Sequence, residues 1–148
     1  TYNASPTAVI AALEMLYAMK SPQKIALLGN MNELGTHSKK AHQEVGAYCN
    51  SDQLDLVVTL GPDANEYLAP TAEAQGCKVV RCNSPYQAAD VIKAELQKNA
   101  IILAKGSQNK VFAEEAVKLL LADKKDANQL VRQSKQWLKV KKKGFRRV

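Results

Sequence analysis

Apolar residues recur along the chain in two patterns, which predict alternating strands and helices. Short aliphatic runs predict buried strands, and apolar residues spaced three or four apart predict helices. The strands are expected at residues 24–28, 56–60, 78–81 and 100–104, and the helices at residues 6–19, 38–49, 85–96 and 111–121. Such strands need crossover connections, so we expect a Rossmann-like, three-layer α/β domain with a mainly parallel sheet.

Two local signals refine the helices. Ser84, Pro85 and Gln87 combine a capping box with proline at the first helical position, which predicts a helix start. Asp63 is expected to cap a short helical stretch that Pro70 interrupts.

The C-terminal part is expected to carry one further helix. From residue 126, apolar residues repeat seven apart, and this predicts a helix that packs back on the domain through Trp137. Residues beyond about Lys141 are expected to be solvated and mobile. We therefore divide the chain into a Rossmann-like domain, 1–124, and an accessory helix with a basic tail, 125–148.

The net charge of +7 is concentrated near the C-terminus. The last fourteen residues hold Lys135, Lys139, Lys141, Lys142, Lys143, Arg146 and Arg147. Because the rest of the chain is close to neutral, this pattern favours a solvated end over a nucleic-acid surface. No apolar run approaches the roughly 20 residues that a membrane helix needs.

The remaining composition indicates a cytoplasmic piece of a longer protein. The chain has three cysteines and no CxxC pair, which favours a reduced compartment. It begins without a methionine or a signal segment, directly on a helix lead-in, so we expect it to start inside a larger protein.

Several kinds of chemistry are disfavoured at the carboxyl ends of the predicted strands, where α/β proteins place their sites. Gly29 and Gly35 are six apart and do not form a GxGxxG loop, and the chain has no GxxxxGK[ST] loop. His37 and His42 are five apart without partners at metal-ligand spacing, so zinc is not supported. Ser107 lacks the second glycine of a nucleophile elbow.

Lys105, Gly106 and Ser107 lie between a predicted strand and a predicted helix, and two interpretations of them stay open. Backbone amides, a hydroxyl and an ammonium at a helix N-terminus would suit a carboxylate or phosphate. Alternatively, Gly106 makes the turn, Ser107 caps the helix and Lys105 is solvated.

Five motifs resemble, in order and spacing, the C-terminal domain of the D-alanyl-D-alanine-adding Mur ligases. They are Tyr2-Asn3-Ala4-Ser5-Pro6, Gly29-Asn30-Met31-Asn32-Glu33-Leu34-Gly35, His42 with Val45-Gly46, Lys105-Gly106-Ser107, and Glu114-Glu115-Ala116-Val117. The resemblance runs from Tyr2 to about Leu121. The family more often has asparagine at Ser5, aspartate at Asn30 and arginine at Gln108, and the last difference removes a bidentate carboxylate clamp.

The resemblance implies a function for the domain within a larger enzyme. It implies the substrate-closing domain of an ATP-dependent amide-bond ligase that adds D-alanyl-D-alanine to UDP-N-acetylmuramoyl-tripeptide in peptidoglycan synthesis. Upstream N-terminal and central domains would be its partners, ATP and Mg²⁺ would serve the full-length enzyme, and this domain alone would bind no metal and carry no catalytic residue. It implies nucleotide-side roles for Tyr2 and Asn3, and substrate-binding roles for Asn30, Glu33, Lys105, Ser107 and Gln108. His42 is expected to be structural.

The alternative is a non-catalytic Rossmann-like binding module whose basic tail docks on nucleic acid or an anionic membrane. Binding with a steep salt dependence, lost on removal of residues 135–148, would favour this module. An upstream GxxxxGK[ST] loop would favour the ligase.

Overall fold

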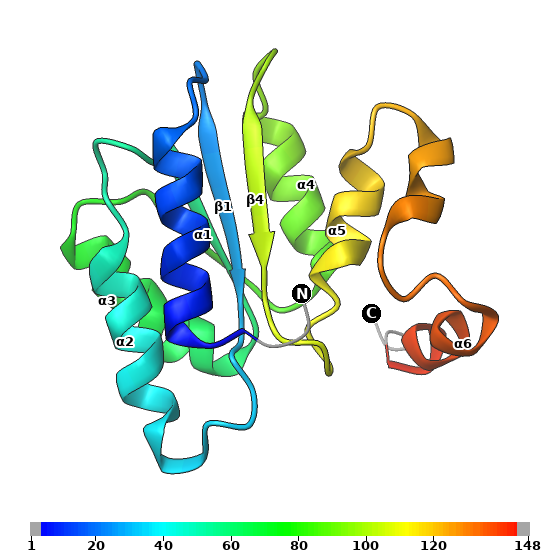
Figure 1. Cartoon of the computed structure of the whole chain (residues 1–148), viewed down its shortest axis with the longest axis horizontal. Coiled ribbons are helices and arrows are strands. Elements are labelled where there is room, and N and C mark those ends of the chain that lie inside the picture. The colour runs from blue at the N-terminus through cyan, green and yellow to red at the C-terminus, as the bar shows by residue number, and fades with distance from the viewer. Residues whose placement is uncertain (1–3, 145–148) are drawn as a thin grey trace.

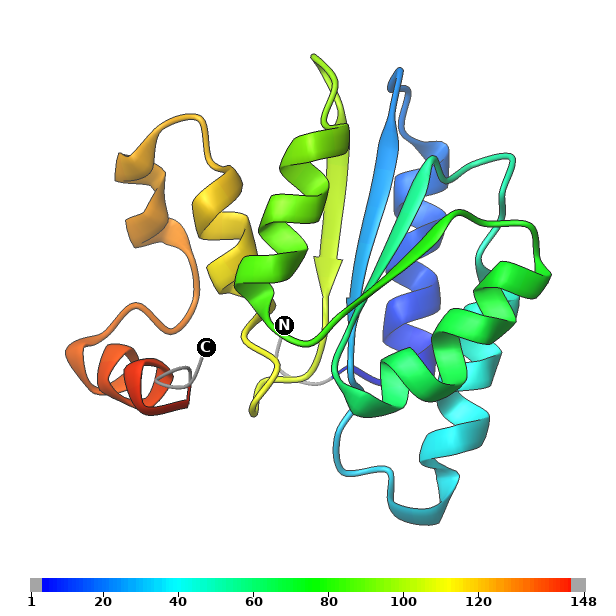
Figure 2. The same cartoon turned by 180° about the vertical axis from the view of Figure 1, so that it is seen from behind.

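The computed structural model describes residues 4–144 and shows a four-stranded parallel sheet between two layers of helices (Figures 1 and 2). The strands are β1 (Lys24–Gly29), β2 (Leu56–Leu60), β3 (Val79–Cys82) and β4 (Ile101–Lys105), in the order β3-β2-β1-β4. The α-helices are α1 (Pro6–Ala18), α2 (Ser38–Tyr48), α3 (Ala69–Ala74), α4 (Pro85–Glu95), α5 (Ala113–Leu120) and α6 (Lys135–Gly144). The predicted α/β fold class is confirmed.

Both faces of the sheet are covered, which explains why its strands are continuous apolar runs. Ala26 and Leu28 of β1 point to the side covered by α1, α2 and α3. Ile25 and Leu27 point to the side covered by α4 and α5. Within residues 4–144, no helix is long and apolar enough to span a bilayer.

The neighbouring strands β1 and β4 send the chain to opposite faces of the sheet. After β1 the chain enters α2, on the α1 side, whereas after β4 it enters α5, on the α4 side. Their carboxyl ends lie together at the lower edge of the sheet in Figure 1. Open α/β sheets bind ligands at such a switch point, so the functional site is expected there.

Two glycines allow the ends of β1 and β4 to approach closely. A Cβ atom on Gly29 would lie 2.3 Å from Cγ1 of Val111 and 3.3 Å from Cα of Gly106. A Cβ atom on Gly106 would lie 3.1 Å from Cα of Gly29. Both positions therefore exclude a side chain, and Val111 fills the space instead.

The helix after β2 differs from the prediction. Pro70 does not interrupt it, because a π-helical turn, Ala64–Leu68, leads directly into the first turn of α3, where the missing proline amide is tolerated. Asp63 does not cap this helix through its side chain. Its carboxylate accepts a hydrogen bond from Oγ of Ser38 instead.

The sequence pattern also predicts the start of α5 two residues too early. The helix begins at Ala113 rather than Val111, because Lys110 and Phe112 have left-handed backbones, with φ of 64° and 50°. Val111 is buried against Gly29 and Gly106 instead of forming the first turn.

The prediction of one helix from residue 126 was wrong. A 3-10 segment, Lys124–Gln129, comes first, the backbone turns at Arg132 with φ of 59°, and only α6 is α-helical. Trp137 does dock, edge-on to Phe112, with ring centroids 6.5 Å apart. Lys141, expected to be solvated, is only 3% exposed, because it pairs with buried carboxylates.

The glycine contact generates a first prediction. Gly29→Ala should lower the free energy of unfolding by about 1–3 kcal/mol, because a stiff valine and a backbone atom must both move. Gly144→Ala is the matched control, since a Cβ there meets nothing within 4 Å. Denaturant melts of both variants measure the difference, and equal stabilities would contradict the close approach.

Candidate functional site

The loops that follow β1 and β4 are joined by three hydrogen bonds. The amide of Ser107 donates to the carbonyl of Asn30 (2.9 Å), and the amide of Asn32 donates to Oγ of Ser107 (2.7 Å). Nδ2 of Asn32 donates to the carbonyl of Asn109 (2.6 Å). Ser107 is only 3% exposed, so its hydroxyl connects the two loops from a buried position.

Asn30 links these two loops, which together form a corner at the switch point, to the loop after β2. Its amide donates to the carbonyl of Leu60 (3.0 Å), and its Oδ1 accepts a hydrogen bond from the amide of Ala64 (2.9 Å). The side chain lies against Gly61, where a Cβ atom would come within 2.7 Å of Oδ1. The structure thus uses this predicted substrate-binding residue to hold two loops together.

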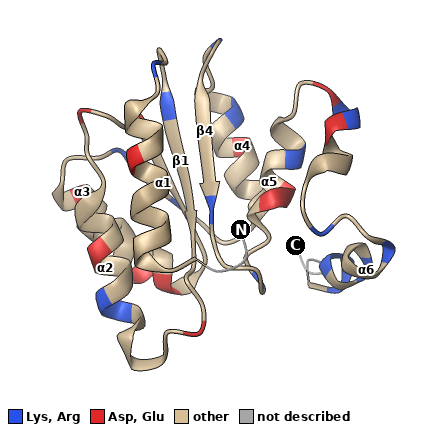
Figure 3. Ribbon diagram, viewed as in Figure 1, with Lys and Arg blue, Asp and Glu red and all other residues tan. Residues whose placement is uncertain are grey.

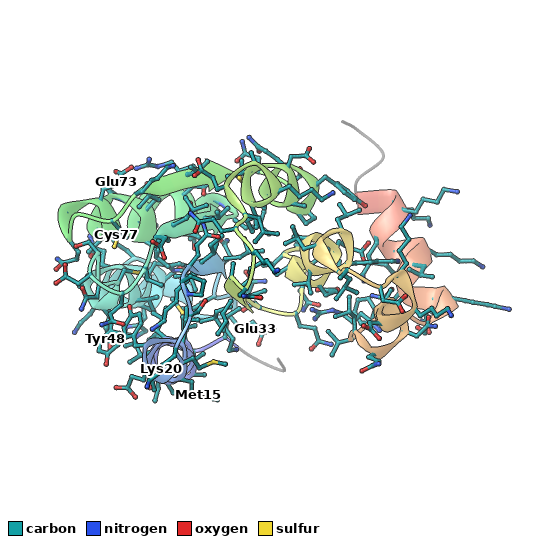
Figure 4. All side chains as sticks on the ribbon, turned by 90° about the horizontal axis from the view of Figure 1, so that it is seen from above. Met15, Lys20, Glu33, Tyr48, Glu73 and Cys77 are labelled. Atoms are coloured by element: carbon teal, nitrogen blue, oxygen red, sulfur yellow. The ribbon has the colours of Figure 1, made fainter. Side chains whose placement is uncertain are left out.

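Glu33 is exposed at the surface of the loop after β1 (Figure 4). Its backbone is left-handed, with φ of 65°, a conformation that costs a non-glycine residue on the order of 1–3 kcal/mol. The adjacent Leu34 packs against the core and holds the loop in this shape. Glu33 is therefore placed where its carboxylate can meet a ligand.

Lys105 ends β4 at the switch point and is partly buried. Burial lowers the pKa of its ammonium from the usual value. Removing water from an ammonium also strengthens its attraction to an anion.

Gln108 directly follows Ser107 in the loop after β4 and is half-buried. Its backbone carbonyl accepts a hydrogen bond from Nη1 of Arg132 (3.1 Å). Tyr2 and Asn3 lie outside the described residues.

His42 fixes the loop after β1 onto α2. Its side chain is completely buried, and Nε2 lies 3.0 Å from the amide of Met31, which can only donate. The ring proton is therefore on Nδ1, which donates to the carbonyl of Ser38 (2.8 Å). Burial lowers the pKa of His42, and this effect outweighs the Ser38 carbonyl and the nearby Asp63, which raise it. The neutral ring has the structural role that the sequence predicts.

The first turn of α5 is acidic and faces α6, whose charged residues are basic (Figure 3). Four charged side chains of α5, α6 and the segment before α6 form a buried network there. Arg132 binds the carboxylate of Glu114 with two nitrogens, at 2.8 and 2.6 Å. Nζ of Lys141 lies 3.0 Å from Glu114, 2.6 Å from Glu115 and 2.9 Å from the carbonyl of Arg132. The four side chains are at most 10% exposed, and two carboxylates balance two cations.

The pKa of Glu114 shows how the network is balanced. Burial raises that pKa, but the hydrogen bonds from Arg132 and Lys141 lower it by more, so the carboxyl stays ionised. Sequence reasoning missed this network. The signal available was the adjacent pair Glu114 and Glu115 in the first turn of a helix with a largely apolar sequence, because buried acids require cations.

No group of three or more histidine, cysteine, aspartate or glutamate residues within the described part of the chain could hold a metal ion. The corner at the switch point presents the partly buried ammonium of Lys105 and the exposed carboxylate of Glu33, whereas the amides of Asn32 and Ser107 bond to the protein itself. These groups suit a ligand that carries both an anionic and a cationic end.

Known sequences match this chain over most of its length. The family described as "Mur ligase, glutamate ligase domain" matches residues 1–108. The UDP-N-acetylmuramoyl-tripeptide--D-alanyl-D-alanine ligase of Haemophilus influenzae is 32% identical over 114 residues, 74% of this chain and 24% of that protein. The ligase of the same name from Bacillus subtilis is 31% identical over 123 residues, 81% of this chain and 26% of that protein. The chain thus spans about a quarter of the length of these relatives.

Solved structures show the same fold. The MurF ligase from Thermotoga maritima, in complex with ADP, superposes with a TM-score of 0.67 and 27% identity, over 87% of this chain and 28% of that chain. A MurF structure from Acinetobacter baumannii gives a TM-score of 0.61 over 79% of this chain and 26% of that one; at 22% identity, it supports the fold alone.

The buried histidine predicts a pH dependence. Because the folded-state pKa of His42 lies below its unfolded value of 6.5, stability is fully present above about pH 6.5 and is lost as the pH falls further. His42→Phe should reduce this loss between about pH 7 and 5. At about pH 8 it should cost about 1–3 kcal/mol, because the Met31 amide loses its acceptor.

Denaturant melts across this pH range measure both effects. His37→Phe is the matched control, since His37 is exposed, and it should melt like the parent at about pH 8. An unchanged pH slope for His42→Phe would show that the ring does not titrate on unfolding.

The ion network predicts that Lys141 is an anchor. Lys141→Met should destabilise the chain by about 3–5 kcal/mol, because two buried carboxylates would keep only one cation. Cutting after Val140 should have the same effect. Lys143→Met, on the exposed surface of the same helix, should change stability by less than about 0.5 kcal/mol. Thermal melts that do not separate the two variants would mean that Lys141 is solvated.

Proposed function

The chain belongs to the Mur ligase family through its glutamate ligase domain, and on this basis we propose a function for it. It is the C-terminal, substrate-closing domain of an ATP-dependent amide-bond ligase that adds D-alanyl-D-alanine to UDP-N-acetylmuramoyl-tripeptide in peptidoglycan synthesis. One observation carries the proposal. The two loops to which the resemblance assigns substrate contacts, residues 29–35 and 105–108, are hydrogen-bonded to each other at the switch point.

The residues of this corner take different parts in the proposed reaction. The ammonium of Lys105 is proposed to contact a carboxylate, or the negative charge that develops on the reacting group, because it is partly dehydrated. Glu33 is exposed and suited to an amine. The remaining proposed substrate residues, Asn30, Ser107 and Gln108, shape the loops around these two charges. Tyr2 and Asn3 are proposed for the nucleotide side.

ATP and Mg²⁺ are proposed to bind in upstream N-terminal and central domains. The Thermotoga maritima relative was solved with ADP, which supports nucleotide use in that protein. ATP would supply the activation of the tripeptide carboxylate. This domain would then close on the other two, hold the amine of D-alanyl-D-alanine near that carboxyl and exclude water.

The cytoplasm is the proposed compartment, since Cys49, Cys77 and Cys82 are buried free thiols. The rival function, a module that docks its basic tail on nucleic acid or a membrane, has less support. The Mur ligase family covers residues 1–108, and Lys141 of the basic run is occupied by buried carboxylates.

Lys105 provides the test of this function. In the full-length ligase, Lys105→Ala should lower the rate of amide formation by one to several orders of magnitude, because a charge contact to a reacting anion is lost. Lys98→Ala is the control, as an exposed lysine before the opposite end of β4.

The assay measures release of phosphate with the UDP-linked tripeptide and D-alanyl-D-alanine, and the melting temperature of each variant shows that it is folded. The 148-residue chain alone should release none. Equal rates for Lys105→Ala and Lys98→Ala would show that Lys105 takes no part in the reaction. Activity of the isolated chain would contradict the domain assignment.

A further inference from the structure

We propose that the C-terminal segment 122–144 is a clamp that sets the geometry of the loop after β4, with Arg132 as its positioning residue. The family match ends at residue 108, before this segment begins. The structural part of the proposal stands on the contacts of the chain itself, and its kinetic part rests on the proposed function.

Arg132 connects the loop to the helix that follows it. Nη1 donates to the carbonyl of Gln108 (3.1 Å), while Nε and Nη2 donate to the two carboxylate oxygens of Glu114 (2.8 and 2.6 Å). The guanidinium is planar and rigid, so these three bonds fix the distance and angle between Gln108 and the first turn of α5. The side chain is 7% exposed, and water therefore competes little for these bonds.

The segment also holds Phe112, at the other end of the loop. The ring of Trp137 packs edge-on against Phe112, and Nζ of Lys141 lies 5.9 Å from the centre of the same ring. Phe112 and Lys110 both have left-handed backbones. Non-glycine residues keep such a backbone only where surrounding contacts enforce it, and Trp137 and Lys141 supply those contacts at Phe112.

The loop is therefore held from two sides. On the inner side, Ser107 and Asn109 are bonded to the loop after β1. On the outer side, Arg132 and Trp137 hold Gln108 and Phe112. Lys105 directly precedes this loop, so the orientation of its ammonium and of the neighbouring amides depends on both sets of contacts.

Arg132→Lys separates positioning from charge. A lysine keeps a cation beside Glu114 but lacks the fork that reaches Gln108 at the same time. Arg81→Lys is the matched control, because Arg81 also binds a carboxylate, that of Glu73, with two nitrogens. Arg81 lies on β3, at the opposite edge of the sheet from β4 and the loop that follows it.

Amide hydrogen exchange in the 148-residue chain tests the clamp itself. In Arg132→Lys, exchange at Ser107 and Asn32 should accelerate roughly tenfold, whereas exchange at Val57, bonded between β2 and β3, should not change. Trp137→Leu removes the contact with Phe112 without altering charge and should accelerate the same two amides. Unchanged exchange at Ser107 and Asn32 in both variants overturns the clamp.

Kinetics of the full-length ligase test the positioning role. Arg132→Lys should raise KM for D-alanyl-D-alanine about tenfold and leave KM for ATP unchanged, whereas Arg81→Lys should change neither. A merely destabilised domain would lower kcat through loss of folded enzyme and leave both KM values alone, and that result overturns positioning by Arg132. If the parent enzyme does not ligate at all, the proposed function fails, while the exchange measurement still decides the clamp.

Discussion

The close contact between the ends of β1 and β4 determines where the candidate site lies. Because Gly29 and Gly106 have no side chains, the two strands bring their carboxyl ends together, and Val111 closes the space above them. The following loops then run close enough for the Ser107 amide to donate to the Asn30 carbonyl and for the Asn32 amide to donate to the Ser107 hydroxyl. A side chain at either glycine would separate these loops and disperse the polar groups at the switch point.

The polar groups around this contact are buried but fully satisfied. Within residues 4–144, every buried side-chain nitrogen or oxygen has a hydrogen-bond partner. Neutral His42 holds one loop, and the charged pair of Arg132 and Glu114 holds the other. Such networks favour one rigid geometry, because any displacement leaves a buried polar group unpaired. A domain that closes on others would thus carry a preformed corner rather than assemble one during closure.

The sequence predicted elements whose cause is local and missed those whose cause is tertiary. Four strands were predicted because burial on both faces requires continuous apolar runs. The left-handed backbone of Phe112 was not, since phenylalanine has no intrinsic preference for it. Lys141 resembled its solvated neighbours in sequence, and only its carboxylate partners, Glu114 and Glu115, distinguish it. Pairing across more than twenty residues depends on the fold and leaves no periodic pattern.

The same reasoning explains how the chain tolerates its departures from the family pattern. At Asn30, where the resemblance leads us to expect aspartate, the structure uses a side-chain oxygen to bind the amide of Ala64, and asparagine supplies that oxygen. At Gln108, where arginine is usual, the contact that holds the loop is made by the backbone carbonyl, which any residue provides. Together the two departures remove one negative and one positive charge, so the net charge of the corner is unchanged. In the proposed function, recognition of a carboxylate there would then depend more heavily on the partly dehydrated ammonium of Lys105.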